Sequence, residues 1–172
     1  MSVTTAQPAS VTLRDPAYLV APNALRYWVA GELVTGVIWW VVLFALYSLA
    51  IPDSWKVWAG PVAVFFAVVS VAQVSVVPVW RYRVHRWEVT STAIYTRSGW
   101  LVREQRIAPL SRVQTVDSQR GPVMRLFGLA SITVTTASAA GPITIECLDS
   151  EVAEQVVAEL TEITSRTEGD AT

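Results

Sequence analysis

The sequence predicts a membrane-anchored α+β protein, in which a two-helix transmembrane hairpin precedes an antiparallel β sandwich or barrel capped by a C-terminal helix. Two long apolar runs, residues 33–51 and 57–79, contain no charged side chain. Short segments in which apolar and polar residues alternate follow from residue 81 onward. An amphipathic stretch then closes the chain, and it must cover an open side of the sheet.

The two apolar runs are long enough to cross a bilayer. As helices they would extend roughly 28 Å and 34 Å, and a hydrocarbon core is about 30 Å thick. Trp is enriched at the headgroup level, and four tryptophans lie near the run ends: Trp28, Trp55, Trp58 and Trp80. One alternative is a pair of soluble core helices, which rarely stay apolar all round. The other is a cleaved signal peptide, which the long lead before residue 33 and the second run argue against.

The positions of lysine and arginine predict that both termini are cytoplasmic. Arg14 and Arg26 precede the first run and three arginines follow the second, whereas Lys56 alone lies in the turn 52–56. Positive residues favour the cytoplasmic side of spans. The turn is too short for a domain, so we expect any binding or chemistry on the cytoplasmic side.

Composition divides the chain into four parts. Residues 1–22 are a lead that is expected to be disordered, because its start is rich in Ser, Thr, Ala and Pro. The hairpin region is 23–80, and Asn23 is the expected N-cap of its first helix. One domain occupies 81–166, and 167–172 form a disordered tail.

The domain is predicted to contain six or seven short antiparallel strands. The stretch 82–97 is rich in aromatic and β-branched residues, and a turn at Ser98-Gly99 predicts a hairpin between 94–97 and 100–102. The strand 112–118 alternates imperfectly, which a β-bulge would repair.

A short helix and two regular strands complete the predicted domain. The helix is 123–127, between two glycines, and the strands are 132–136 and 143–147. Asp149 is the expected N-cap of the last helix. Apolar residues at helical spacing form its buried stripe, namely Val152, Val156, Leu160 and Ile163.

Three stretches resemble a known family: RWEVT from residue 86, PLSRVQTV from residue 109 and GPVMRLFGLA from residue 121. They are similar to bacterial pleckstrin-homology-like (PH-like) membrane proteins of the YdbS type, over most of residues 23–160. The resemblance implies a two-helix membrane hairpin followed by a bent seven-stranded sandwich or barrel with a C-terminal helix. It implies no catalytic residue.

No catalytic or metal-binding pattern is evident in the sequence. His85 is the only histidine, and Cys147 is the only cysteine and lies on the apolar face of a strand. No phosphate-binding glycine loop is present. We therefore expect no enzyme activity, cofactor or metal. An enzyme with an unrecognised site is the alternative, and these two residues would be its best candidates.

Charge is distributed unevenly along the predicted domain. Residues 81–125 contain nine arginines, and residues 146–172 contain eight acids. This asymmetry suits a domain oriented by an anionic leaflet. Three arginines next to the second span are expected to contact lipid headgroups: Arg81, Arg83 and Arg86. If this segment is a strand, Arg81 and Arg83 lie on the same face of it. The mildly acidic chain argues against nucleic acid as a partner.

These observations predict an interaction or scaffolding module at the cytoplasmic face of a bacterial inner membrane. It would bind a membrane-associated protein partner, anionic lipid headgroups, or both, and a homo-oligomer stays open. The expected partner contacts lie in one block: Gly121, Pro122, Met124 and Arg125. The alternative is an accessory subunit of a larger membrane complex that assembles through small hairpin residues: Gly36, Ser48, Ser70 and Ser75.

Overall fold

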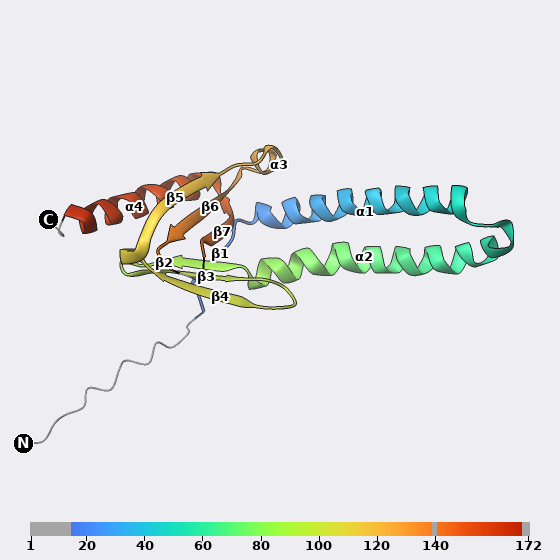
Figure 1. The fold of residues 1–172 in the computed structure, drawn as a ribbon, viewed down its shortest axis with the longest axis horizontal. Helices are drawn as coiled ribbons and strands as arrows, with labels where there is room; N and C mark the ends of the chain where they lie inside the picture. Colours follow the sequence, from blue (N-terminus) through green and yellow to red (C-terminus); the bar gives the residue numbers. More distant parts are fainter. Residues whose placement is uncertain (1–14, 139–140, 170–172) are drawn as a thin grey trace, which may run out of the picture.

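The computed structural model describes residues 15–138 and 141–169 as a long helical hairpin with a β domain at one end (Figure 1). The two long helices are α1 (Asn23–Ala50) and α2 (Ala59–Val84), joined by the 3-10 helix η1 (Asp53–Trp58). In the most apolar windows of the two spans, 0% and 6% of residues are buried. Helices that are apolar and exposed on all sides suit lipid and not a soluble core. The predicted transmembrane hairpin is confirmed.

The domain consists of two antiparallel sheets, with strand orders β1-β2-β3-β4 and β5-β6-β7. The first sheet contains β1 (Tyr18–Leu19), β2 (Arg86–Val89), β3 (Ala93–Ser98) and β4 (Glu104–Pro109). The second contains β5 (Val113–Gln119), β6 (Leu129–Thr136) and β7 (Ile143–Asp149). The short helices η2 (Leu110–Arg112) and α3 (Pro122–Leu126) connect strands, and α4 (Ser150–Gly169) packs on the second sheet. This confirms the PH-like sandwich with its C-terminal helix.

The core lies between the two sheets and α4. Burial alternates along β6, where Ile132 and Val134 are fully enclosed. The predicted stripe of α4 faces the same core, and Leu160 is fully buried there. Asp149 caps this helix as predicted, because its Oδ1 accepts a hydrogen bond from the Glu151 amide at 3.1 Å.

The predicted strand 112–118 with its bulge is confirmed, whereas the predicted hairpin between 94–97 and 100–102 is wrong in its returning strand. The pairing of β5 with β6 shifts between Val113 and Thr115, which is the expected bulge. In contrast, β3 pairs Ser98 with Glu104, so residues 100–102 form the loop and not the returning strand. Three successive apolar side chains would place bulky groups on both faces of a strand, whereas a loop exposes all three.

The predicted boundaries are wrong at three places. Residues 18–19, in the lead predicted to be disordered, pair with the edge of β2 and so satisfy backbone groups there. Helix α2 continues to Val84, so Arg81 and Arg83 lie on a helix, where positions two apart do not share a face. Helix α4 continues to Gly169, into the predicted tail. Residues 1–14 and 170–172 lie outside the described residues.

Asn23 is the first residue of α1 and not its N-cap. Pro22 occupies the cap position without a side-chain hydrogen bond. The Asn23 Nδ2 instead donates to the Phe127 carbonyl at 3.2 Å. The side chain therefore ties the start of the hairpin to the segment after α3.

Candidate functional site

The hairpin and the domain meet in a buried junction. Trp28 of α1 and His85, directly after α2, are 6% and 5% exposed, and their ring centroids lie 5.1 Å apart. The guanidinium of Arg81 lies 4.6 Å from the Trp28 ring centroid. Its Nη2 also donates to Glu146 Oε2 of β7 at 3.5 Å. Three segments that are far apart in the sequence are thus joined at one point.

Helical periodicity explains why the start of α1 belongs to this junction. Ala24 and Trp28 are one turn apart and face the same way, into a cluster that also contains Val20, Leu129 and Cys147. The chain enters α1 from β1 along β7, because the Ala21 amide donates to the Cys147 carbonyl at 3.0 Å. The hairpin is consequently packed into the domain and not joined to it by a linker.

Burial shifts the pKa values of the two residues that sequence analysis weighed as enzyme candidates. The pKa of His85 is lowered, chiefly by burial, although a hydrogen bond to the Arg81 carbonyl and the charge of Glu146 oppose the shift. Burial, reinforced by Glu146, raises the pKa of the Cys147 thiol to about 11. A protonated thiol is a poor nucleophile at neutral pH. Both residues therefore act as parts of the junction core.

The three arginines predicted to contact headgroups have different environments. Arg81 is turned into the junction, where Trp28 and Glu146 engage it. Arg86 is half-buried, and its Nε has no hydrogen-bond partner among the described residues. Arg83 is exposed in the last turn of α2. The structure therefore places these residues in different environments, and Arg83 is the most exposed of the three.

The block predicted to contact a partner forms α3 and its flanks. Met124 and Phe127 are partly buried and pack on the junction cluster, and the Phe127 ring lies 5.9 Å from Tyr27. Pro122 and Arg125 are exposed, and Gly121 is half-buried. Val123 and Leu126, which the sequence analysis did not single out, are 51% and 83% exposed. One face of this helix packs on the domain, and the other exposes Val123 and Leu126 together with Arg125.

A polar pair inside the hairpin also escaped sequence analysis. Glu32 precedes the first apolar run, but α1 begins nine residues earlier, so Glu32 lies within the membrane-crossing helix. Gln73 Nε2 of α2 donates to Glu32 Oε2 at 2.9 Å. The sequence signal for this pair was the polar Gln73 in an otherwise apolar run, because polar side chains within a membrane usually form hydrogen bonds with neighbouring helices.

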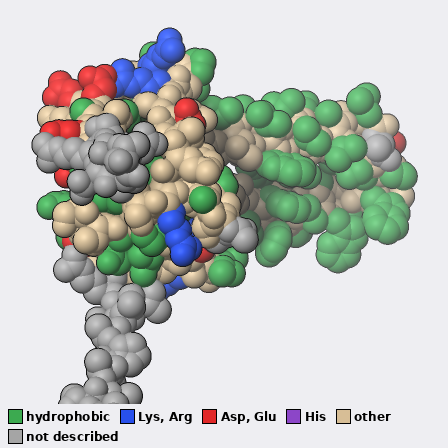
Figure 2. Space-filling model, turned by 60° about the vertical axis from the view of Figure 1, so that its left-hand side comes forward, with side chains coloured by type: hydrophobic (Ala, Val, Ile, Leu, Met, Phe, Trp, Pro, Cys, Tyr) green, Lys and Arg blue, Asp and Glu red, His purple; other side chains and the backbone are tan. Residues whose placement is uncertain are grey.

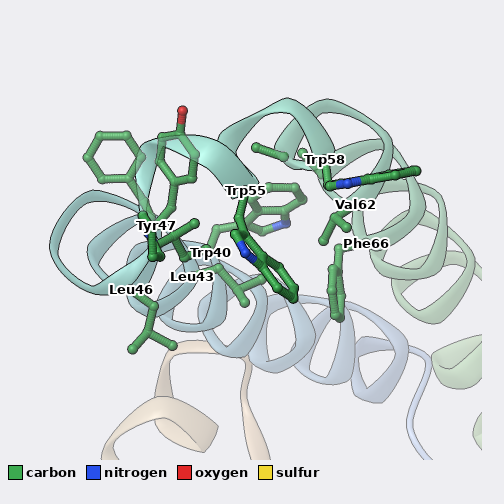
Figure 3. A pocket seen from close by; sticks show the side chains of 13 residues that line it. Trp40, Leu43, Leu46, Tyr47, Trp55, Trp58, Val62 and Phe66 are labelled. Atoms are coloured by element: carbon green, nitrogen blue, oxygen red, sulfur yellow. The ribbon is translucent and has the colours of Figure 1, made fainter.

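The two long helices enclose hollows between them. One of them, of about 570 Å³, lies near the hairpin turn and is lined mostly by aromatic and aliphatic side chains. Figure 3 shows Trp55 reaching from the connection into this space, with Trp40 and Phe66 around it. A second hollow, of about 320 Å³, lies nearer the domain and contains Glu32 and Gln73. The facing surfaces of the helices are therefore incompletely packed.

The surface of the molecule reflects these two parts. Figure 2 shows a hairpin whose side chains are almost continuously apolar, beside a domain with a mixed surface on which acidic side chains gather at one corner. Within residues 15–138 and 141–169, no three His, Cys, Asp or Glu side chains converge where a metal ion could be held.

Fold and junction together define a bacterial transmembrane protein with a PH-like domain. The chain belongs to the bacterial PH domain family, whose model matches residues 24–164. It is 26% identical over 157 residues to the transmembrane protein YdbS of Bacillus subtilis, in an alignment that covers 91% of this chain and 98% of that protein. No solved structure matches the chain. The family is not an enzyme family.

Proposed function

We propose that the chain is a membrane-tethered docking module, which holds a PH-like domain at the cytoplasmic face of a bacterial inner membrane and binds a protein partner there. The free edge of β5 is the observation that carries this proposal. Among the described residues β5 pairs only with β6, so its other edge has no strand beside it. An extended peptide can add to such an edge through main-chain hydrogen bonds.

The side chains of β5 suit reversible binding of a partner. Exposed residues of this strand are polar, and none is a large apolar group that would favour aggregation: Gln114, Thr115, Asp117, Ser118 and Gln119. Only Val113 and Val116 turn partly into the core. The backbone would supply affinity, and the alternate side chains would supply specificity.

The junction explains how a tethered domain can present this edge in a fixed direction. Trp28, Arg81 and Glu146 join α1, α2 and β7. A domain on a flexible linker would sample many orientations, whereas a packed junction restricts them. This rigidity supports a scaffolding role, in which the height and orientation of the partner above the bilayer are set by the hairpin.

The proposed cytoplasmic location rests on charge. Arg83 is exposed beside the domain, and Lys56 at the hairpin turn is paired with Asp53. Positive residues favour the cytoplasmic side. A reporter fused after Thr172 that is active only in the cytoplasm is the expected result, and activity only outside would contradict this topology.

The docking proposal is tested by a photo-cross-linking amino acid placed at Gln114 of β5 in the full-length protein in native membranes. Gln155, an equally exposed glutamine on α4, is the matched control. We expect one adduct of defined mass at Gln114 that is absent at Gln155. An adduct at Gln155 alone would move the partner to α4, and no adduct at either position would contradict the proposal.

Headgroup binding is the second part of the proposed function, and Arg83 is its main contact. An exposed arginine near an anionic leaflet gains about 1 kcal/mol. The thermal midpoint of the protein in vesicles should therefore rise with the fraction of anionic lipid. Arg83→Gln should weaken that dependence, whereas Arg120→Gln, which removes a partner of Glu154, should leave it unchanged.

A second candidate function is that of an accessory subunit whose hairpin packs on partner spans. The hollows between α1 and α2 favour it, because a partner helix could fill them. Gly36 lines the second hollow, and a Cβ there would meet no atom within 4 Å. Gly36→Leu should abolish a complex seen by native electrophoresis. Gly31→Leu, outside the hollow, should preserve it, and equal behaviour of the two variants would count against this function.

A further inference from the structure

Among the described residues after α2, the exposed large apolar side chains are confined to two places. There are five such side chains in this described part of the chain: Trp100, Leu101, Val102, Val123 and Leu126. The first three form the loop between β3 and β4, and the last two lie on α3. Leu101 and Val102 are 78% and 80% exposed. Contiguous exposed apolar groups mark a surface that is covered in the working protein.

Both places lie on the side of the domain from which the two long helices emerge (Figure 1). Figure 1 shows the loop between β3 and β4 and the helix α3 reaching out on the side of the domain from which α1 and α2 emerge, one along each helix. Trp100 shares a surface hollow with Val76, Val77 and Arg81 of α2. Val76 lies five residues before Arg81, about 7 Å further into the span. The hollow beside the loop is therefore lined in part by residues of the apolar run 57–79.

The local chemistry of both places is that of a membrane interface. Val123 and Leu126 are three residues apart on α3 and share its outer face. An exposed arginine accompanies each apolar group, Arg103 after the loop and Arg125 within α3. Apolar side chains beside arginines are typical of segments that rest in the boundary between headgroups and acyl chains.

We infer that the loop 99–103 and helix α3 insert into the leaflet next to the domain, where their apolar side chains contact acyl chains and Arg103 and Arg125 contact headgroups. The bilayer is the occupant that the geometry favours, because both apolar places lie on the side of the domain from which the membrane-crossing helices emerge (Figure 1). The domain then touches the membrane at three places and cannot tilt about the hairpin. This inference goes beyond the docking function and does not depend on it.

The test uses the full-length protein in vesicles of phosphatidylethanolamine and phosphatidylglycerol, part of which carries bromine on its acyl chains. Leu101→Cys and Leu126→Cys are labelled separately with an environment-sensitive fluorophore. Val64→Cys in α2 is the membrane control, and Gln155→Cys on α4 is the aqueous control. The native Cys147 is buried, so the unaltered protein provides the labelling blank.

We expect brominated lipid to quench a large fraction of the fluorescence of the labels at 101 and 126, approaching the quenching of the label at 64. Iodide in the buffer should quench only the label at 155. Quenching by iodide at 101 and 126 would place the loops in water and overturn the inference. Protection from both quenchers would also overturn it, because a protein surface would then cover the loops. Quenching by brominated lipid at only one of the two positions would overturn the inference that the domain contacts the membrane at three places.

Discussion

The guanidinium of Arg81 lies over the indole ring of Trp28, 4.6 Å from the ring centroid. The two residues belong to different helices of the hairpin, and both are held by the domain through Glu146 and the cluster around Cys147. This contact joins the two helices of the hairpin at the place where they meet the domain.

Replacing Arg81 should loosen this junction measurably. A partly desolvated cation–π contact contributes about 1–2 kcal/mol, and the half-exposed ion pair with Glu146 adds little. We expect Arg81→Met to lower the thermal midpoint in mild detergent, whereas Arg83→Met, at an exposed position, should not. In a double-mutant cycle with Trp28→Leu, additive effects would mean that the ring and the guanidinium do not interact.

The stability of the domain should fall in mild acid through His85. Its pKa is lowered in the folded state, so the folded protein binds fewer protons than the unfolded chain below the ordinary value of 6.5. The contribution of the neutral ring is present above pH 6.5 and is lost as the pH decreases through the lower folded pKa. Thermal midpoints measured between pH 7.5 and 5 should show this loss, since the range spans the ordinary pKa of His.

The matched variant for this prediction is His85→Asn, whose side-chain amide can still donate to the Arg81 carbonyl. This variant should lose much of the pH dependence over the same range. A variant with the pH profile of the original protein would assign the effect to another group.

The backbone at Cys147 should tolerate alanine better than valine. Cys147 has a φ of +54°, in the left-handed region, and its amide donates to Ser131 Oγ at 3.2 Å. A β-branched residue is strained there, at a cost of about 1–3 kcal/mol beyond the lost thiol contacts. We expect Cys147→Val to be less stable than Cys147→Ala in thermal unfolding. Equal stability of the two would contradict the strained geometry.

Gly99 should be indispensable to the loop between β3 and β4. Its φ is +103°, and a Cβ there would lie 1.9 Å from the Val102 carbonyl oxygen. Gly99→Ala therefore combines backbone strain with a collision, whereas Gly128→Ala, at a φ of +67° with open space, meets strain alone. Thermal unfolding should rank Gly99→Ala as the more destabilised of the two. The reverse order would mean that the loop has another conformation.

The polar pair in the hairpin should contribute modestly to the association of its helices. Hydrogen bonds between membrane helices are worth about 1 kcal/mol. Gln73→Leu removes the donor to Glu32, and Ser70→Ala, one turn away, removes a hydroxyl bonded only within its own helix. Unfolding in detergent should show a loss for the first variant and little change for the second. No difference between them would indicate that the pair is broken in a membrane-like environment.

Much of the fold follows from local patterns. The apolar runs predicted both spans, the alternation along β6 and β7 predicted their buried faces, and helical spacing predicted the stripe of α4. The three apolar residues 100–102 were misassigned to a strand because composition alone does not distinguish a strand from an exposed loop. The candidate site was less predictable. The sequence indicated Arg81 and Cys147 but gave no sign that they share one cluster with Trp28.

By itself the sequence determined that this protein has two membrane spans, a PH-like domain after them and a strongly basic segment beside them. Periodicity and hydropathy are local properties, and they are sufficient for these conclusions. Only the tertiary structure decided that Arg81 turns inward to Trp28 and Glu146, that Glu32 meets Gln73 and that Trp100 shares a surface hollow with residues of α2. These residues lie about 20 to 65 positions apart in the sequence, and their geometry exists only after the sheets and helices have packed together.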